Sequence, residues 1–119
     1  MVSPSEGSVV LVRFPFSDLS SSKLRPALVL ASAGREDWIL CQVTSNPYAD
    51  LIAIQITDSD FETGSLQRVS YVRPGKLFTA NSSLMETEVG RLNTTTFKNV
   101  VTTIVDIFQR AAKAKYSVP

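Results

Sequence analysis

The alternation of apolar and polar positions predicts short strands over residues 8–92. In SVVLVRFPF, residues 8–16, a period of two places Val10, Val12 and Phe14 on one face, and the pattern ends near Pro15. After Pro26, ALVLAS continues as a strand with too little polarity to face water on either side. Further strand-like segments are WILCQVTS (38–45), LIAIQIT (51–57), LQRVSYVR (66–73), KLFT (76–79) and TEVGRL (87–92).

Polar stretches separate these segments. SDLSSSK, residues 17–23, is too long for a tight hairpin and predicts an exposed, mobile loop. Residues 34–37 and DSDFETGS, residues 58–65, are typical of turns. Pro74 and Gly75 interrupt the strand pattern before KLFT.

From Asn93 onward the period changes to that of a helix. Asn93 or Thr94 can cap its first turn, and Lys113 and Lys115 suit the negative end of the helix dipole. The apolar positions at steps of three and four are Phe97, Val100, Val101, Ile104, Ile107, Phe108 and Ala111. The whole chain, residues 1–119, therefore predicts a single, mainly β domain: a small, curled antiparallel barrel on which a C-terminal helix packs.

Composition limits the classes of function. The net charge of +1 provides no global attraction to nucleic acid or to a membrane, so any site for a polyanion must be a local patch. The single cysteine, Cys41, excludes an intramolecular disulfide and is interpreted as a buried core side chain. With no signal-like or membrane-spanning run in the sequence, a cytoplasmic protein is expected.

Five blocks of the sequence stand in an order that resembles one family. They are VVLVRFPFSD, SKLRPALVL, ILCQVTSN, SYVRPGKLF and VGRL before the helix. Together they resemble the MazF/PemK family, the toxin halves of bacterial toxin–antitoxin pairs. The resemblance implies an SH3-like barrel, shared in outline with the gyrase-poisoning CcdB toxins. It also implies a homodimer that cleaves single-stranded RNA at short sequences with neither metal nor cofactor, leaving a 2′,3′-cyclic phosphate and a 5′-hydroxyl.

The resemblance also suggests the residues of the site. Arg25 and Thr44 are similar to the catalytic pair of the family. Ser45, Ser70 and Lys76 fall in blocks that line the substrate groove in relatives. Phe16 and Lys23 are added as candidate substrate-binding residues. The resemblance also implies a cognate antitoxin with a disordered acidic tail. We expect this tail to cover Arg25 and to displace the 17–23 loop.

Two positions depart from the family pattern. Relatives begin the first strand with Gly-Asp, whereas Ser8 follows Gly7 here, and Arg13 replaces a second Asp. The loss of the first acidic group motivates an alternative hypothesis. In that hypothesis the chain is a gyrase-binding poison or a degenerate RNA-binding member without turnover.

The chemistry of RNA cleavage assigns roles to the candidate pair. The sequence has no histidine, so an imidazole acid–base pair is excluded. The guanidinium of Arg25 suits the stabilisation of charge on the phosphorus, and the hydroxyl of Thr44 can donate to a phosphoryl oxygen. Which group serves as general base or acid stays open. No metal-ligand spacing is recognised among the carboxylates.

Ordinary structural roles compete with each functional one. Without the family context, an Arg-Pro pair at a strand entry is a solvated charge beside a turn former, and a strand-ending threonine is a β-former. Trp38 and Phe14 are assigned to the core, whereas Phe16 is the better candidate for stacking on a base. Strand alternation is expected to separate Arg68 from Arg73.

Overall fold

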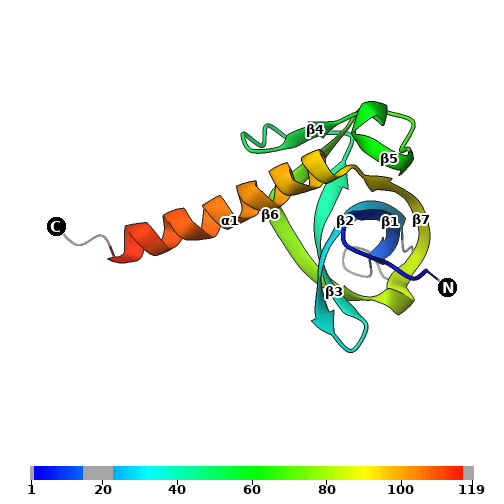
Figure 1. Ribbon diagram of the computed structural model, residues 1–119, viewed down its shortest axis with the longest axis horizontal. Coiled ribbons are helices and arrows are strands. Elements are labelled where there is room, and N and C mark those ends of the chain that lie inside the picture. The colour runs from blue at the N-terminus through cyan, green and yellow to red at the C-terminus, as the bar shows by residue number, and fades with distance from the viewer. Residues whose placement is uncertain (1, 15–22, 117–119) are drawn as a thin grey trace.

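The computed structural model describes residues 2–14 and 23–116. Its described elements form one antiparallel sheet of seven strands, in the order β4-β6-β3-β2-β1-β7-β5, and one long helix. The strands are β1 (Ser8–Phe14), β2 (Lys23–Gly34), β3 (Asp37–Thr44), β4 (Ile54–Ile56), β5 (Phe61–Gly64), β6 (Ser70–Asn81) and β7 (Met85–Leu92), and the helix is α1 (Thr94–Tyr116). Two 3₁₀ turns, Asp58–Asp60 and Ser82–Leu84, precede β5 and β7. The predicted fold class, a curled β sheet closed by a C-terminal helix, is confirmed (Figure 1).

The sheet is buried on both faces, which explains its near-continuous apolar strands. Neighbouring residues of β1 point to opposite sides: Val9 packs into one cluster with Leu28, Cys41 and Val100 of α1. Val10 packs into a second cluster with Val29 and Leu40. The alternation of the first strand thus follows the pleat, as its period predicts.

Two predicted strands begin later than the sequence pattern suggests. Residues 51–53 belong to a turn and not to β4, because the amide of Ile52 donates to Oδ1 of Asp50 and Leu51 is almost fully exposed. β6 begins only at Ser70, which leaves Arg68 in the preceding loop. The predicted break at Pro74 and Gly75 is instead a bulge, since Cys41 pairs with Leu77 while Gln42 pairs with Arg73.

Two further boundaries differ from the sequence pattern. The predicted turn at 58–65 contains the short strand β5, which pairs with β7. Lys23, assigned to the loop, begins β2 opposite Phe14. Residues 17–22 of that predicted loop lie outside the described residues.

The helix begins as predicted but extends past the sheet. Asn93 caps it, with Oδ1 accepting the backbone N–H of Thr96 at 2.8 Å. Its first turns pack through Phe97, Val100 and Ile104, whereas Phe108 is 59% exposed and every described residue after it is exposed. Figure 1 shows this C-terminal half of α1 extending away from the strands, so its apolar residues do not pack on the sheet.

Two glycines allow β5 to lie close against β7. A Cβ on Gly64 would lie 2.1 Å from the carbonyl oxygen of Val89, and Gly64 has a φ of +69°. A Cβ on Gly90 would lie 2.7 Å from the carbonyl oxygen of Thr63. Because backbone atoms form both obstacles, no side-chain rotation relieves them.

We expect Gly64→Ala to lower the free energy of unfolding by about 2 kcal/mol or more, because it adds left-handed strain to a backbone clash. Gly75→Ala is the matched control, since its φ is not in the left-handed region and its nearest neighbour would be the Ile52 side chain at 3.9 Å. Urea unfolding measures both. Equal stability losses in the two variants would contradict this account.

Candidate functional site

The pairing of β2 with β3 sets the position of the two residues predicted to act together. Ala27 lies opposite Gln42 in this antiparallel pair. Ala27–Gln42 is the last pair of this ladder, and two residues further along each strand the alternation of the pleat brings Arg25 and Thr44 to the same side of the sheet. The two residues come from separate predicted segments, and the sheet register brings them together.

Arg25 and Thr44 line one cavity with a volume of about 270 Å³. Arg25 is exposed and Thr44 is half-buried, so both can be reached from solvent. Strands β2 and β3 supply most of the lining, and the rest comes from Leu11 of β1, Ser45 after β3, and the stretch from Leu66 to Ser70 at the start of β6. The polar residues of the lining are Arg25, Gln42, Thr44, Ser45, Arg68 and Ser70.

The cavity suits an anion. Its described lining contains two guanidinium groups, of Arg25 and Arg68, and no carboxylate. Arginine stays charged at all relevant pH values and presents a planar set of donors that matches phosphate oxygens. The whole chain carries a net charge of only +1, so the two arginines make this cavity a local positive patch.

The hydroxyl of Thr44 is oriented by the turn that follows β3. Its Oγ1 donates to the carbonyl oxygen of Asn46 and accepts from the Asn46 backbone N–H, both at 3.1 Å. A hydroxyl has a single hydrogen and rotates readily, so donating to a ligand requires exchange of the bond to the carbonyl. The turn meanwhile holds this oxygen in place beside the cavity that Thr44 lines.

A half-buried ion pair holds Gln42, one of the residues that line the cavity. Nε of Arg73 lies 2.9 Å from Oδ2 of Asp50, and Arg73 Nη1 donates to Oε1 of Gln42 at 3.1 Å. The Arg73 guanidinium also stacks 5.7 Å from the ring centroid of Tyr48. Because Arg73 occupies the carbonyl oxygen of Gln42, the amide nitrogen of Gln42 is left as the donor that can serve a ligand in the cavity.

Ser70 supports the site from within the sheet. It is 3% exposed, and its hydroxyl donates to the carbonyl oxygen of Arg68 at 3.2 Å. Ser70 therefore lines the cavity and also holds the backbone that carries Arg68.

The structure brings together only some of the residues predicted from sequence. Arg25, Thr44, Ser45 and Ser70 line the cavity. Lys23 and Lys76 are exposed residues of β2 and β6 outside that lining. Trp38 packs beside the second core cluster, as assigned. Phe16 and the side chain of Phe14 fall outside the described part of the chain.

Sequence reasoning missed Arg68. Its strand assignment was wrong, because β6 begins at Ser70, so alternation does not determine where the side chain points. The two consecutive polar residues Gln67 and Arg68 already break the period of two and could have indicated a loop.

The two departures from the family pattern lie away from the cavity lining. Ser8 is fully buried, and its hydroxyl donates to a carboxylate oxygen of Glu88. Arg13 forms an ion pair with Glu86 on the neighbouring strand. Neither position therefore removes a group from the site, and the alternative based on Ser8 gains no support from the structure.

Other chemistry finds less support in the described residues. Burial raises the pKa of the Cys41 thiol to about 12, as expected for a core side chain and not for a nucleophile. Within residues 2–14 and 23–116, no group of three or more acidic or cysteine side chains is placed to hold a metal ion. In the same ranges no helix has the length and apolar character needed to cross a bilayer.

The described strands thus form a small, curled antiparallel sheet, with a cavity lined by two arginines between β2, β3 and the start of β6. The family profile described as PemK-like, MazF-like toxin of type II toxin–antitoxin systems matches residues 5–108. The chain belongs to this family. A search of curated protein sequences gave no match.

Solved structures share the fold at low identity. A MazE–MazF complex from Deinococcus radiodurans has 18% identity and a TM-score of 0.69, with 89% of this chain and 96% of that chain covered. Mycobacterium tuberculosis toxin MazF-mt6 has 15% identity and a TM-score of 0.65, with coverages of 86% and 96%. A mycobacterial endoribonuclease in complex with its cognate antitoxin has 16% identity and a TM-score of 0.60, with coverages of 100% and 98%.

The Asp50–Arg73 pair predicts a pH-dependent contribution to stability. The hydrogen bond from Arg73 lowers the pKa of Asp50 below its ordinary value of 3.8, against the raising effect of partial burial. The folded state therefore binds this proton less tightly than the unfolded state does. The stabilisation is complete above the unfolded pKa and is lost as pH falls through the folded pKa.

We expect Asp50→Asn to be less stable than wild type at neutral pH, with the difference shrinking as the pH falls from 7 to about 2. Urea unfolding across that range measures it. Asp106→Asn is the control, because Asp106 pairs with Arg110 on the exposed surface of α1 and such pairs contribute about 0–1 kcal/mol. A stability difference for Asp50→Asn that stays constant down to the lowest pH would refute the assignment.

Proposed function

We propose that this chain is a sequence-specific endoribonuclease toxin that cleaves single-stranded RNA without a metal ion. The observation that carries the proposal is that Arg25 and Thr44 line one solvent-reached cavity that also contains Arg68. Membership of the MazF-like toxin family and structural neighbours named as endoribonucleases support it. The protein would act as a homodimer.

In the proposed reaction the 2′-hydroxyl of the RNA attacks the adjacent phosphorus. The 2′-hydroxyl gives up its proton as the P–O2′ bond forms, the P–O5′ bond breaks, and the 5′-oxygen takes up a proton, so a 2′,3′-cyclic phosphate and a 5′-hydroxyl result with no net change in protons. Arg25 donates to the phosphoryl oxygens, on which negative charge develops, and Thr44 adds a neutral donor after releasing the Asn46 carbonyl. The amide nitrogen of Gln42, oriented through Arg73, is a further donor in the cavity.

We expect Arg25→Gln to reduce the rate of RNA cleavage by about 10²- to 10³-fold, because it removes a preorganised charged donor at the position of the transition-state charge. The assay is cleavage of a long single-stranded RNA in excess chelator, with mapping of the product ends.

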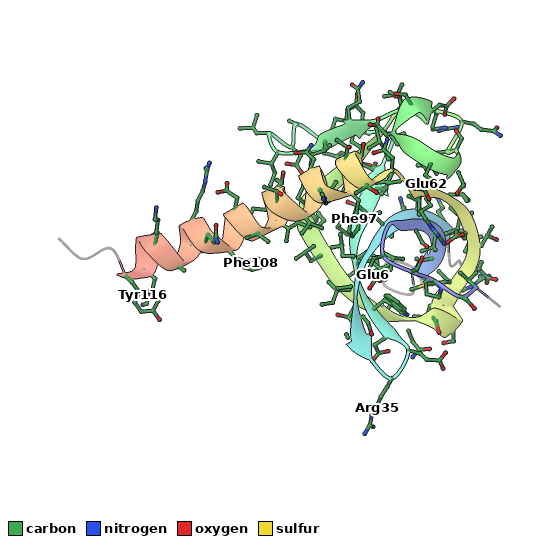
Figure 2. All side chains as sticks on the ribbon, viewed as in Figure 1. Glu6, Arg35, Glu62, Phe97, Phe108 and Tyr116 are labelled. Carbon is green, nitrogen blue, oxygen red and sulfur yellow. The ribbon has the colours of Figure 1, made fainter. Side chains whose placement is uncertain are left out.

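Arg35→Gln is the matched control, because Arg35 is an exposed arginine at the far end of β2 and β3 (Figure 2). Thr44→Val should also lower the cleavage rate, by about tenfold, because it removes one neutral hydrogen-bond donor. Thermal unfolding of this variant checks that the turn after β3 is still stable. Intact RNA with folded wild-type protein, or full activity of Arg25→Gln, would refute the proposal. Gyrase-dependent DNA breaks with undamaged RNA would support the non-nuclease alternative.

A cognate antitoxin is the second proposed partner, as suggested by the neighbours that are complexes with an antitoxin. An extended acidic segment would lie over Arg25 and reach Lys23, because its carboxylates use the same donors as the RNA phosphates. Both side chains are exposed at the start of β2.

Lys23→Glu and Arg25→Glu should each weaken the binding of a fluorescent acidic peptide, whereas Lys98→Glu on the exposed surface of α1 should not. Fluorescence anisotropy at fixed ionic strength measures this. Equal affinity across the three variants would place the acidic segment elsewhere.

A further inference from the structure

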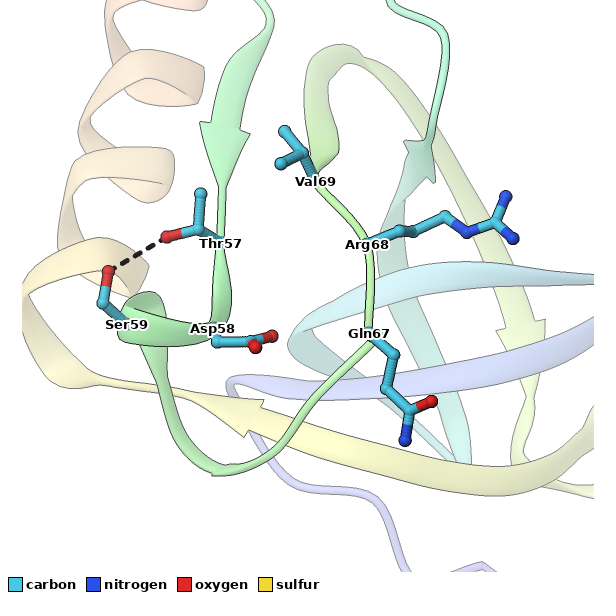
Figure 3. Close-up of a pocket in the computed structure, with 6 residues that line it drawn as sticks. All are labelled: Thr57, Asp58, Ser59, Gln67, Arg68 and Val69. Atoms are coloured by element: carbon cyan, nitrogen blue, oxygen red, sulfur yellow. Dashed lines mark hydrogen bonds between the residues drawn. The ribbon is translucent and has the colours of Figure 1, made fainter.

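A second hollow adjoins the cavity of Arg25 and Thr44. It has a volume of about 340 Å³, and its lining residues are Thr57, Asp58, Ser59, Gln67, Arg68 and Val69 (Figure 3). Arg68 lines both spaces and therefore stands at the border between them. In Figure 3 its side chain extends away from Thr57 and Asp58, with the guanidinium at the far end.

The segment that carries Arg68 is fixed on both sides. Ser65 accepts the Gln67 backbone N–H at 2.8 Å and donates its own hydroxyl to Asp58. Gln67 has a φ of +60°, a left-handed conformation that a side-chain-bearing residue adopts only when its surroundings enforce it. On the other side, the buried Ser70 holds the Arg68 carbonyl. Arg68 is thus presented from an ordered turn.

The two spaces differ in charge. The first contains Arg25 and Arg68 and, in its described lining, no carboxylate. The second contains the carboxylate of Asp58 together with hydroxyl groups and the amide of Gln67. A phosphate is repelled by Asp58, whereas a base with an exocyclic amino group can donate to it. Val69, 48% exposed, provides an apolar surface for the face of a base.

We infer that the hollow lined by Thr57, Asp58 and Ser59 is a second nucleotide subsite, and that Arg68 binds the phosphodiester that joins it to the Arg25–Thr44 cavity. This inference rests on the proposed RNA cleavage. A single strand would run from the reacting phosphate, across Arg68, to a base whose edge is read by Asp58. Arg68 then contributes affinity and register, and Asp58 contributes sequence preference.

The first test measures binding of an RNA made non-cleavable by replacing the 2′-hydroxyl at the cleaved bond with hydrogen. Arg68→Gln should weaken binding and reduce the slope of log affinity against log salt by about 0.7, the value for one phosphate contact on a single strand. Arg35→Gln, the exposed control, should leave the slope unchanged. An unchanged slope in Arg68→Gln would overturn the phosphate assignment.

The second test locates the base. Abasic nucleotides are placed one at a time on each side of the cleaved bond, and kcat/KM is measured for wild type and for Asp58→Asn. We expect one position at which loss of the base lowers wild-type kcat/KM by about tenfold but lowers that of Asp58→Asn less. The reason is that the effects of removing two groups that contact each other are not additive. If, at every position, loss of the base lowered kcat/KM by the same factor in wild type and in Asp58→Asn, the subsite would be overturned. Wild-type protein that neither binds nor cleaves RNA would overturn the proposed function itself, whereas wild-type cleavage with an unchanged kcat/KM in both Arg68→Gln and Asp58→Asn would overturn only this inference.

Discussion

The antiparallel register between β2 and β3 is the constraint on which the candidate site depends. A shift of one residue would turn the side chain of Arg25 or Thr44 to the opposite face of the sheet. The register is held by the burial of Ala27, Leu28 and Val29 against two cores at once, so a slip of one residue would move each of these side chains into the opposite core, whose packing is built for a side chain of another size. The precision of the site is therefore a consequence of core packing and needs no dedicated interaction between the two residues.

Three arginines near the cavity have different surroundings, and the differences assign their roles. Arg73 is satisfied by Asp50 and Gln42 and stacks near Tyr48, so it orients the amide of Gln42 and does not line the cavity. Arg25 and Arg68 line the cavity instead. Pairing one guanidinium with a carboxylate lets the site hold a structural cation without adding its full charge to the surface.

Local pattern predicted much of the fold, and its errors have common physical causes. Period two located β1 and β3, an apolar run after Pro26 located β2, and the change of period at Asn93 located the start of α1. The sequence pattern did not predict the turn at Asp50, where an Asx turn interrupts an apolar run that otherwise suits a strand. It also did not predict the late start of β6, where the left-handed conformation of Gln67 interrupts a second such run. Arg25 and Thr44 were found through the resemblance. Arg68 was not, because its position depends on where a strand begins and not on residue type.

The near-zero net charge bears on how such a site would capture RNA. At physiological ionic strength, charges are screened over about 8 Å, so a chain with a net charge of +1 exerts little attraction at long range. Two guanidinium groups at one cavity act only on a phosphate already close to it. Association is then governed by local fit more than by electrostatic steering. In the proposed function, an RNA strand long enough to meet both Arg25 and the hollow beyond Arg68 would gain contacts that a shorter one lacks, so affinity would depend on these contacts more than on overall charge.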